Sequence, residues 1–394
     1  MVFDVTMPVT LPTMASPALG SHLDAVIDQA IGEERIVGTV VLVAEDGQVV
    51  YRRAAGFADR EEGVRVREDT VFRFASLTKP IVSVTALALM ERGRLRLDSP
   101  VTDWIPWFRP RLADGTEPVI TVRHLMTHTA GLTYGFMELP DSQFHQAGVS
   151  DGLDQPGLSM EENLRRIASV PLNYAPGRRW NYSVATDVLG EVIARCAGMT
   201  LPVVVERLVT GHLGMRHTSF TAAEGVPLAT AYADGDPRPV PMGEPHRIVF
   251  GRSGIHYSPA RAFDETSFPS GGGGMVGTAP DFLAFLEALR MGGAPLLKPE
   301  SVEALTTNAI EDLRVNPVGP GWGFGLGVAV LKDPELAESP ESAGTWRWGG
   351  AYGHSWFVDP AKRLSVVALT NTAVAGMNGS YPEAIRDAVY GFQR

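Results

Sequence analysis

A serine and a lysine three residues apart are the first candidates for chemistry in this sequence. Ser76 and Lys79 lie in the run FASLTKP, residues 74–80, and residues 81–92 after it are rich in helix formers and are followed by a glycine. We therefore expect a helix with Ser76 in its first turn and Lys79 one turn later, on the same face. A helix N-terminus and a dry environment both favour the neutral amine, which can accept the serine proton. The pair therefore indicates an activated nucleophile.

A plainer interpretation also fits this pair. A serine at the start of a helix is commonly an N-cap, and the spacing Ser-x-x-Lys often arises by chance. Catalysis would need a second proton carrier, and Tyr182 is a candidate, at a predicted helix start in RRWNYSV, residues 178–184. A phenol beside an ammonium group loses its proton more readily and could relay protons to a leaving group. The alternative is a tyrosine packed at a helix start.

A glycine-rich run could supply an oxyanion hole, which acyl transfer also needs. The run is WRWGGAYGHSW, residues 346–356, and its pattern is typical of the edge of a strand. Such an edge can present a backbone N–H to the negative charge that develops on a carbonyl oxygen.

In this order, the three motifs resemble those of the serine β-lactamase and penicillin-binding-protein superfamily, which carries S-x-x-K, then Y-x-N or S-x-N, then K-T-G. The third motif here is W-G-G at residues 348–350, the pattern of the family VIII carboxylesterases, which resemble class C β-lactamases. The runs LMTHTAGL, residues 125–132, and GHSWFVD, residues 353–359, are similar to the same family. The resemblance extends from about Leu23 to Tyr390, nearly the whole chain.

The resemblance implies a role for each matching residue. Ser76 matches the nucleophile, Lys79 its general base and Tyr182 the partner in proton transfer. The main-chain N–H groups of Ser76 and Ala351 would form the oxyanion hole. His354 follows the proposed oxyanion strand, so it either orients main chain or touches substrate. The residues expected to bind substrate are Tyr134, Trp348, Gly349, Gly350 and His354.

Two departures from the superfamily pattern favour neutral esters. Trp348 stands where K-T-G has lysine, so this motif has no cation to bind the carboxylate of a β-lactam or to help Tyr182 lose its proton. Val184 stands where Y-x-N has asparagine, which removes an amide that would bind an acylamino side chain. Both changes make the site more apolar.

The resemblance implies a serine carboxylesterase that hydrolyses short-chain acyl esters through a covalent acyl-serine intermediate, with no cofactor and no metal. Alternatives on the same site are a β-lactamase or D-peptidase, which would cleave amides, and an acyltransferase, which would pass the acyl group to an alcohol. An alternative of another class is an inactive, penicillin-binding-like binding module. That module would be expected to lack one of Ser76, Lys79 and Tyr182, and the sequence has all three.

Four other patterns have plainer explanations. Ser150 is the centre of a G-x-S-x-G match, but neither flank resembles the strand and helix of a nucleophile elbow. The G-x-G-x-x-G match at residues 272–277 has no strand before it, so a flexible turn is expected. His124 and His128 have zinc-like i, i+4 spacing but no completing glutamate, and we interpret them as structural. Cys196 lies in an apolar helix and is expected in the core.

The composition is that of a globular protein without nucleic-acid or membrane partners. The chain has 394 residues, 44% of them hydrophobic and 20% charged, and its net charge of −11 disfavours nucleic acid and anionic membranes. One cysteine excludes an intrachain disulfide and fits a reducing compartment. The N-terminus does not resemble a signal peptide, and no apolar run reaches about 18 residues. We expect a cytoplasmic protein that acts on a small-molecule ester, in an oligomeric state that the sequence leaves open.

The elements that must position these residues follow from periodicity and turn signals. A D-G turn joins two apolar runs into a hairpin over 39–55. In GWGFGLG, residues 321–327, alternate residues are glycine, so another element can approach that face closely. Residues 221–272 are mostly irregular, a length that favours a functional role such as lining a pocket. Helices are predicted over 23–36, 81–92, 121–129, 161–170, 184–196, 279–290 and 382–392, and strand-like runs over 321–331, 345–349, 354–358 and 364–371.

The order of these elements predicts an α+β fold, and the resemblance implies that it is β-lactamase-like. One antiparallel sheet would be built from the N- and C-terminal segments and flanked by helices. Residues 1–20 would form an irregular arm, and residues 21–394 one catalytic unit. Its α/β part would span about 21–80 and 275–394, with a mainly helical lobe over about 81–274.

Overall fold

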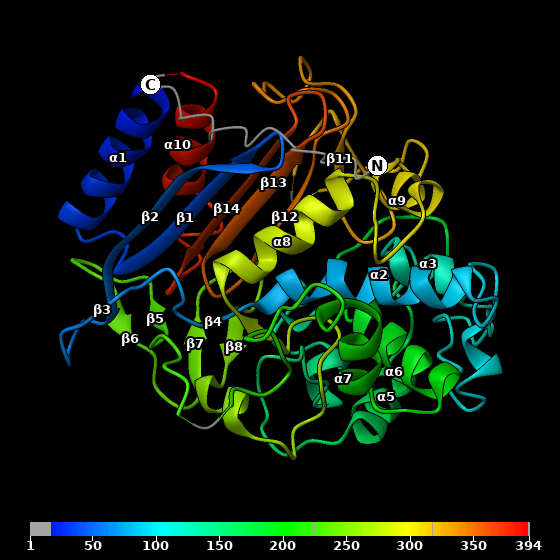
Figure 1. Ribbon diagram of the computed structural model, residues 1–394. Helices are drawn as coiled ribbons and strands as arrows, with labels where there is room; N and C mark the ends of the chain where they lie inside the picture. Colours follow the sequence, from blue (N-terminus) through cyan, green and yellow to red (C-terminus); the bar gives the residue numbers. More distant parts are fainter. Residues whose placement is uncertain (1–16, 224, 317, 393–394) are drawn as a thin grey trace, which may run out of the picture.

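The two ends of the chain meet in one antiparallel sheet. The computed structural model describes residues 17–392 except 224 and 317, and within them this sheet has eight strands. Figure 1 shows its N-terminal strands, in blue, beside its C-terminal strands, in orange. In spatial order the strands are β10 (Trp322–Phe324), β11 (Ala329–Leu331), β12 (Trp346–Gly350), β13 (His354–Asp359), β14 (Leu364–Thr370), β1 (Gly38–Glu45), β2 (Gln48–Asp59) and β3 (Val64–Arg65). The predicted sheet built from both chain ends is confirmed.

Strand β1 joins the two halves of this sheet. It pairs with β14 on one side and with β2 on the other, and every residue except Glu45 is buried. Its run of valines suits a strand that is packed on both faces. Asp46 and Gly47 both have positive φ, 51° and 82°, as the two-residue D-G turn requires. The predicted hairpin is confirmed.

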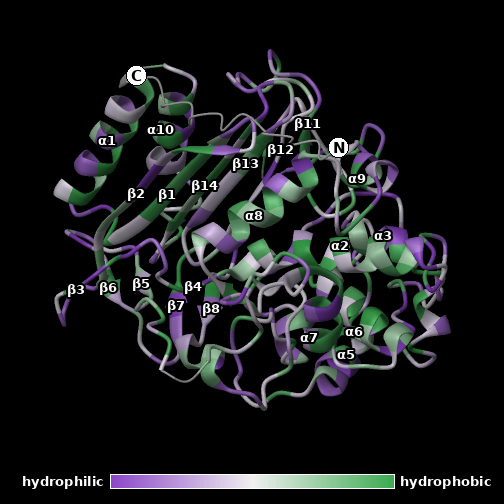
Figure 2. Cartoon of the chain, in the orientation of Figure 1, coloured by the Kyte–Doolittle hydropathy of each residue, from purple (hydrophilic) through white to green (hydrophobic). Residues whose placement is uncertain are grey.

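Helices cover both faces of the sheet, and each face has its own hydrophobic core. On one face, Leu23 of α1 and Ile385 of α10 pack with Val41 of β1. On the other face, Val40 and Leu42 join the larger core that α2 and α8 share. This division follows from the alternation of side chains along a strand. Figure 1 shows α1 and α10 together on one side, and Figure 2 shows hydrophobic colour along the central strands.

The predicted helices are present, with shifted ends. The helix expected from residue 23 begins at Pro17, so residues 17–20 of the predicted irregular arm are helical, and residues 1–16 lie outside the described residues. The helices are α1 (Pro17–Gly32), α2 (Thr78–Glu91), α3 (Val122–Met126), α4 (Gln143–Gln146), α5 (Met160–Ser169), α6 (Ala185–Ala197), α7 (Leu201–Val205), α8 (Ala279–Arg290), α9 (Pro299–Thr306) and α10 (Ser380–Val389).

Short strands interrupt the part of the chain expected to be mainly helical. Residues 232–233 pair in parallel with the C-terminal residues 372–373, so the segment predicted to be irregular is tied to the other end of the chain. The small sheets consist of β4 (Phe72–Arg73) with β9 (Val276–Gly277), of β15 (Thr372–Ala373), β5 (Tyr232–Ala233) and β6 (Val240–Pro241), and of β7 (His246–Ile248) with β8 (Ile255–Tyr257).

The strand-like run 321–331 is two strands and not one. The chain reverses after Phe324, and β10 pairs with β11 so that Trp322 lies opposite Leu331. The close approach expected at the glycines is present, because a Cβ atom on Gly327 would collide with the Ser83 side chain of α2. Gly327 therefore lets the turn between β10 and β11 pack directly on α2.

Within the described part of the chain, each helix taken singly is too short or too polar to cross a bilayer. Together, α6 and the segment Leu201–Thr210 reach the length and hydropathy of a span, but they meet at an angle of 77°.

Candidate active site

Ser76 lies in a tight turn immediately before α2. The 3₁₀ turn Ala75–Leu77 connects β4 to the helix, and Lys79 occupies the first turn of α2. The expectation that Ser76 itself would be in that first turn is wrong, because α2 begins at Thr78. Ala75 has a φ of +46°, a conformation that costs a non-glycine residue about 1–2 kcal/mol. Such strain is typical of positions where a reactive group must be presented.

Two proton carriers converge on the Ser76 hydroxyl. Lys79 Nζ lies 3.1 Å from Ser76 Oγ, and the Tyr182 hydroxyl donates to the same oxygen at 2.6 Å. Lys79 is 1% exposed, and its Nζ also donates to the Gly272 carbonyl at 2.7 Å. The structure therefore brings Ser76, Lys79 and Tyr182 together at one oxygen atom.

Aromatic rings enclose the Tyr182 side chain. Trp348 Nε1 donates a hydrogen bond to the Tyr182 oxygen at 3.0 Å. Trp180 stacks on the Tyr182 ring with an interplanar angle of 9°, and the centroid of the Tyr134 ring is 4.9 Å away. Lys79 Nζ lies 4.5 Å from the centroid of the Tyr182 ring, within the range of a cation–π contact. Trp348 thus supplies a hydrogen-bond donor at the place where the sequence indicated only a lost cation.

The end of β12 lies against the turn that carries Ser76. A Cβ atom on Gly350 would be 2.5 Å from the Phe74 carbonyl oxygen, so the close approach requires glycine here. Ala351 follows, and its carbonyl accepts a hydrogen bond from the Tyr257 hydroxyl at 2.9 Å. Outside helices and strands, the backbone hydrogen bonds of the described residues include none donated by the Ala351 N–H. This placement is compatible with an oxyanion hole formed by the N–H groups of Ser76 and Ala351.

His354 lies behind this strand, away from the substrate side. It is 0% exposed, its Nε2 is 2.6 Å from the Arg73 carbonyl oxygen, and its Nδ1 accepts the Thr370 N–H at 3.3 Å. Burial lowers the pKa of His354 to about 4, so the ring is neutral at pH 7. Of the two roles expected for His354, orientation of main chain fits this position. Neither His354 nor Gly350 lines the cavity described next, whereas Tyr134, Trp348 and Gly349 do.

A cavity of about 520 Å³ opens over Ser76. Its volume lies in the range of ligand sites. The segment 221–272, expected to line a pocket, contributes Phe250, Ile255 and Gly272. From the predicted set, the cavity walls include Ser76, Tyr134, Tyr182, Trp348, Gly349 and Ala351. Apolar side chains in the wall include Phe136, Met137, Leu153, Phe250 and Ile255, and the charged side chains of Arg347, Glu383 and Arg386 also line it.

Asp151 is a carboxyl group in this wall that sequence reasoning did not single out. Its Oδ1 accepts the Gly135 N–H at 2.7 Å. Removal from water, and to a smaller extent the charge of Asp154, raises the pKa of Asp151 to about 8. The side chain is therefore mostly neutral at pH 7. No spacing in the sequence marks it, because its burial depends on loops that meet only in the fold.

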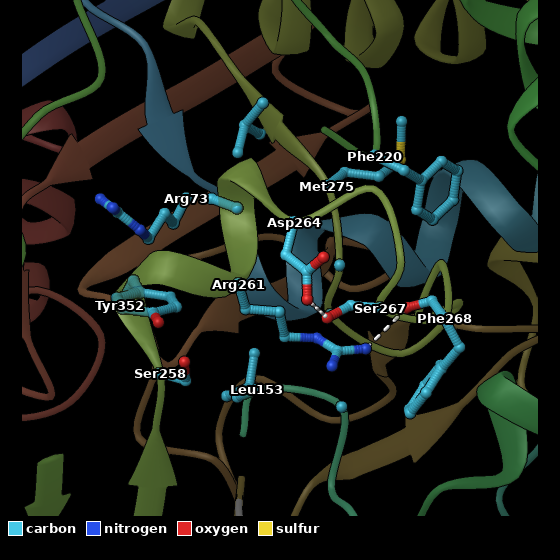
Figure 3. Close-up of a pocket in the computed structure, with 15 residues that line it drawn as sticks. Arg73, Leu153, Phe220, Ser258, Arg261, Asp264, Ser267, Phe268, Met275 and Tyr352 are labelled. Atoms are coloured by element: carbon cyan, nitrogen blue, oxygen red, sulfur yellow. Dashed lines mark hydrogen bonds between the residues drawn. The ribbon is translucent and has the colours of Figure 1, made fainter. Parts of the chain in front are cut away.

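A second, smaller cavity lies beside Arg73 and Arg261 and is shown in Figure 3. Its volume of about 30 Å³ leaves room for only one or two water molecules. Arg261 donates to the carbonyls of Asp154 and Phe268, and Arg73 binds carbonyls in the same way. These guanidinium groups hold loops together, and Ser76 does not reach this cavity.

Comparison with known proteins places this geometry in a family. The beta-lactamase family profile matches residues 23–390, nearly the whole chain. The chain belongs to the beta-lactamase family. Within the family, it is 49% identical to Esterase EstB of Burkholderia gladioli over 381 residues, which cover 96% of this chain and 97% of EstB.

Solved structures of this family agree with the fold. EstCE1, described as a hydrolase with promiscuous acyltransferase activity, is 45% identical with a TM-score of 0.91, over 95% of this chain and 98% of EstCE1. Unliganded simvastatin synthase (LovD) from Aspergillus terreus, 21% identical, has a TM-score of 0.75 over 95% of this chain and 98% of its own. The predicted β-lactamase-like fold is confirmed.

The serine of the G-x-S-x-G match lies in a loop. Ser150 follows α4 without a strand before it, and its Oγ donates to the Asp154 carboxylate at 2.5 Å. The nearby His145 contacts Ser253 and the Gly135 carbonyl and not Ser150. Ser150 therefore has the surroundings of a loop serine, as expected, and lacks those of an elbow nucleophile.

The glycine-rich run 272–277 has a role that sequence reasoning missed. The sequence indicated a flexible turn, but the Gly272 carbonyl holds Lys79 Nζ. A Cβ atom on Gly274 would lie 2.8 Å from the Ser270 backbone nitrogen, so the loop folds tightly on itself. The only available signal was the density of glycines, which permits close backbone approach.

The two histidines with zinc-like spacing have separate partners. The Nδ1 atom of His124 accepts the Thr121 N–H as part of a helix cap, and the Nδ1 atom of His128 lies 3.2 Å from Ser183 Oγ. Nowhere in the described residues do three or more His, Cys, Asp and Glu side chains gather as a metal site would need. Cys196 is 2% exposed in α6, where the core position was expected.

Proposed function

We propose that this chain is a serine carboxylesterase of the family VIII type, which hydrolyses esters with short acyl chains through an acyl-serine intermediate. The observation that carries the proposal is the convergence of Lys79 Nζ, at 3.1 Å, and the Tyr182 hydroxyl, at 2.6 Å, on Ser76 Oγ in the wall of the 520 Å³ cavity. The identity of 49% to Esterase EstB supports an ester as the substrate.

In the proposed reaction, Ser76 Oγ attacks the ester carbonyl while Lys79, together with Tyr182, takes the hydroxyl proton. The N–H groups of Ser76 and Ala351 stabilise the oxyanion. The bond between carbonyl carbon and alcohol oxygen then breaks, and Tyr182 delivers the proton to the departing oxygen. A water molecule, deprotonated by the same groups, attacks the acyl ester, and the acid leaves as Ser76 regains its proton.

Trp348 and Val184 favour a neutral ester over a β-lactam. Trp348 replaces the lysine of K-T-G, and its indole N–H is directed at Tyr182. Val184, in place of the asparagine of Y-x-N, is 0% exposed and therefore offers no group to an acylamino side chain. We propose that Tyr134, Trp348 and Gly349 contact the substrate.

Acyl transfer to an alcohol is a second candidate for the same site. An apolar wall that includes Phe136, Leu153 and Phe250 can bind the hydrocarbon part of an alcohol, which then competes with water for the acyl-serine. The description of EstCE1 as a hydrolase with promiscuous acyltransferase activity supports this candidate. Formation of a new ester from an added alcohol, faster than hydrolysis, would favour it.

We further propose that the enzyme is cytoplasmic and acts on a small-molecule ester without nucleic-acid or membrane partners. The net charge of −11 disfavours binding to polyanions and anionic lipids. A single, buried cysteine suits a reducing compartment. Cell fractionation followed by immunodetection tests the location.

The proposed function is tested by comparing Ser76→Ala and Ser150→Ala with the wild type on p-nitrophenyl butyrate, with nitrocefin in parallel. We expect Ser76→Ala to lose essentially all ester turnover and Ser150→Ala to keep most of it. The wild type should turn over nitrocefin far more slowly than the ester. Loss of turnover in Ser150→Ala, with activity kept in Ser76→Ala, would contradict Ser76 as the nucleophile. Activity kept in both variants would show that neither serine is the nucleophile.

A further inference from the structure

The carboxylate of Asp187 lies beside the Lys79 site, and the reaction proposed above does not use it. Asp187 is in the first turn of α6, the helix that follows Tyr182, and it is 0% exposed. Its Oδ1 accepts hydrogen bonds from the Ser270 hydroxyl at 2.5 Å and from the Gly272 N–H at 3.2 Å. Its Oδ2 is buried and has no hydrogen-bond partner among the described residues. A half-satisfied buried carboxylate is costly, so its presence requires an explanation.

Asp187 and Lys79 hold the two ends of one glycine. The Gly272 N–H binds Asp187 Oδ1, and the Gly272 carbonyl accepts the bond from Lys79 Nζ at 2.7 Å. A Cβ atom on Gly272 would lie 2.6 Å from Asp187 Oδ2 and 2.9 Å from the Tyr134 hydroxyl. The free oxygen of Asp187 is thus next to the residue that anchors the lysine. A change at Asp187 would be transmitted to Lys79 through the Gly272 backbone.

Other contacts hold the loop that carries Gly272 on both sides of this residue. The position of Gly272 itself therefore depends on its bond to Asp187. A Cβ atom on Gly271 would lie 2.5 Å from the Thr186 carbonyl oxygen, which shows how closely α6 packs on the loop. Arg261 holds the Phe268 carbonyl, a hydrogen bond drawn as a dashed line in Figure 3. Between these two supports, Asp187 is the group that binds the Gly272 N–H.

Charged groups from several elements face Asp187. Lys79 on α2 and Arg261 favour its ionised form, whereas Asp151 and Tyr134 lie close enough to interact unfavourably with a carboxylate. Burial raises the pKa of Asp187, and its hydrogen bonds and the Lys79 charge oppose that rise. Lys79 therefore interacts with Asp187 through space as well as through Gly272.

We propose that Asp187 is a positioning residue of the Ser76 site: it fixes the Gly272 carbonyl that holds Lys79 Nζ, and its negative charge stabilises the protonated amine during the reaction. The inference rests on the proposed function for its substrate and on the observed bonds for its geometry. The free Oδ2 then has an explanation, because it contributes charge beside the amine and needs no donor of its own.

The variant Asp187→Asn tests the proposal, because asparagine keeps the shape and one acceptor but removes the charge. We expect kcat for p-nitrophenyl butyrate to fall about tenfold or more, since small displacements of catalytic groups are costly. We also expect the acid limb of the kcat/KM profile to move to lower pH by about one unit, because loss of a nearby negative charge favours the deprotonated base. A purely structural role would lower the amount of folded enzyme without moving the pH profile.

Two controls separate position from charge. Ser270→Ala removes one bond to Oδ1 and keeps the carboxyl group, so we expect a lower kcat and a smaller movement of the acid limb than in Asp187→Asn. Glu287→Gln removes a buried carboxylate of α8 that binds Ser365 and Arg290, outside the cavity, and should change neither quantity. Each variant is first checked for folding by its thermal transition.

A fluorophosphonate labels a reactive serine without any ester being hydrolysed. The rate at which it labels Ser76, measured against pH, therefore tests the role of Asp187 separately from the proposed function. A wild type that is labelled but does not hydrolyse esters would contradict the function and leave the Asp187 test intact. Wild-type kcat and an unmoved acid limb in Asp187→Asn would overturn the inference. If Asp187→Asn does not fold, unchanged kcat in Ser270→Ala would overturn it instead.

Discussion

At the scale of single residues, reactivity depends on how the Tyr182 oxygen is held. That oxygen donates to Ser76 Oγ at 2.6 Å and accepts from Trp348 Nε1 at 3.0 Å. A phenolic oxygen that accepts the indole N–H is held in one orientation, with its own O–H directed at Ser76 Oγ, so the indole positions Tyr182 for proton transfer. Trp348, which is uncharged, thus supplies a donor to Tyr182 at the position where K-T-G has a lysine cation.

The substitution Trp348→Phe removes this donor and keeps an aromatic ring in place. We expect kcat to fall about tenfold, the equivalent of one hydrogen bond of about 1.4 kcal/mol. Steady-state kinetics on a p-nitrophenyl ester measures the effect. The matched control is Trp180→Phe, because Trp180 also contacts the Tyr182 ring but its Nε1 has no partner among the described residues. Equal losses in both variants would show that ring packing, and not the hydrogen bond, is responsible.

Asp151 gives the cavity a dependence on alkaline pH. Its pKa is raised from 3.8 to about 8, so a negative charge forms in the wall as the pH passes about 8 and opposes the developing oxyanion. We expect wild-type kcat/KM to decline above this pH and Asp151→Asn to lose that decline. The folded state also keeps a proton that the unfolded state releases, so wild-type stability should fall, relative to Asp151→Asn, as the pH rises from 4 to 8. If kcat/KM and stability depended on pH in the same way in the wild type and in Asp151→Asn, the titration of Asp151 would not be the cause.

At the scale of elements, the junction between β12 and the Ser76 turn aligns the nucleophile with the proposed oxyanion hole. Gly350 allows the strand to approach the Phe74 carbonyl, and His354 holds the Arg73 carbonyl from behind. Two consecutive carbonyls before Ser76 are thus fixed by a strand from the other end of the chain. The distance between the nucleophile and the Ala351 N–H follows from this contact.

Gly350→Ala should disturb that junction. The added Cβ atom would meet the Phe74 carbonyl at 2.5 Å, and backbone at that distance must shift. We expect kcat/KM to fall about 100-fold, because a displacement near 1 Å of a catalytic group has this effect. Gly32→Ala, where a Cβ atom has nothing within 4 Å, is the matched control and should retain activity. If Gly350→Ala kept the kcat/KM of the wild type, the contact between β12 and the Ser76 turn would tolerate a side chain at this position.

Local periodicity explains what could be predicted at this scale. Helical spacing put Ser76 and Lys79 on one face, and the D-G turn at residues 46–47 placed the hairpin, because both signals are confined to neighbouring residues. Tyr182 was a candidate from its place at a predicted helix start, and the resemblance to a family assigned its role; Ala351 entered only through that resemblance. Asp187 lay in a helix that was predicted, but no pattern in the sequence showed which loop its side chain would meet.

The misses have a common physical origin in contacts between distant segments. The run 321–331 begins with alternating glycine and apolar residues like a single strand, yet the chain reverses after Phe324, where Gly327 lets α2 approach. For His354 the sequence left substrate contact and orientation of main chain both open, and only the fold shows its bond to the Arg73 carbonyl in the core. Burial of this kind is decided by tertiary packing and leaves no periodic trace.

At the scale of the whole molecule, the hydrophobic cores on the two faces of the sheet lie at different distances from Ser76. The core shared with α2 contains the residues around Ser76, whereas the core under α1 and α10 lies on the opposite face of the sheet. The cavity over Ser76 is lined in part by residues of α10 but by none of α1, so stability can be lost in α1 while the geometry at Ser76 is kept.

Leu23→Ala in α1 tests this separation. Leu23 is 0% exposed in the second core, so its truncation should lower the free energy of unfolding by about 2–5 kcal/mol. We expect kcat/KM at 25 °C to remain within about twofold of wild type, because no residue of α1 lines the cavity. Urea denaturation and ester kinetics on the same preparation measure both quantities. Leu336→Ala, at a position 58% exposed, is the control and should leave both unchanged.

The pairing of β1 with β14 also bears on how the protein is made. The Thr39 hydroxyl binds the carbonyl of Leu369, 330 residues later. At about 5–20 residues per second, the ribosome needs roughly 15 to 65 s to supply that partner. During this time the valine-rich hairpin leaves the exit tunnel with one edge unpaired, a surface to which chaperones bind. The step that completes the sheet is thus deferred until translation is almost finished.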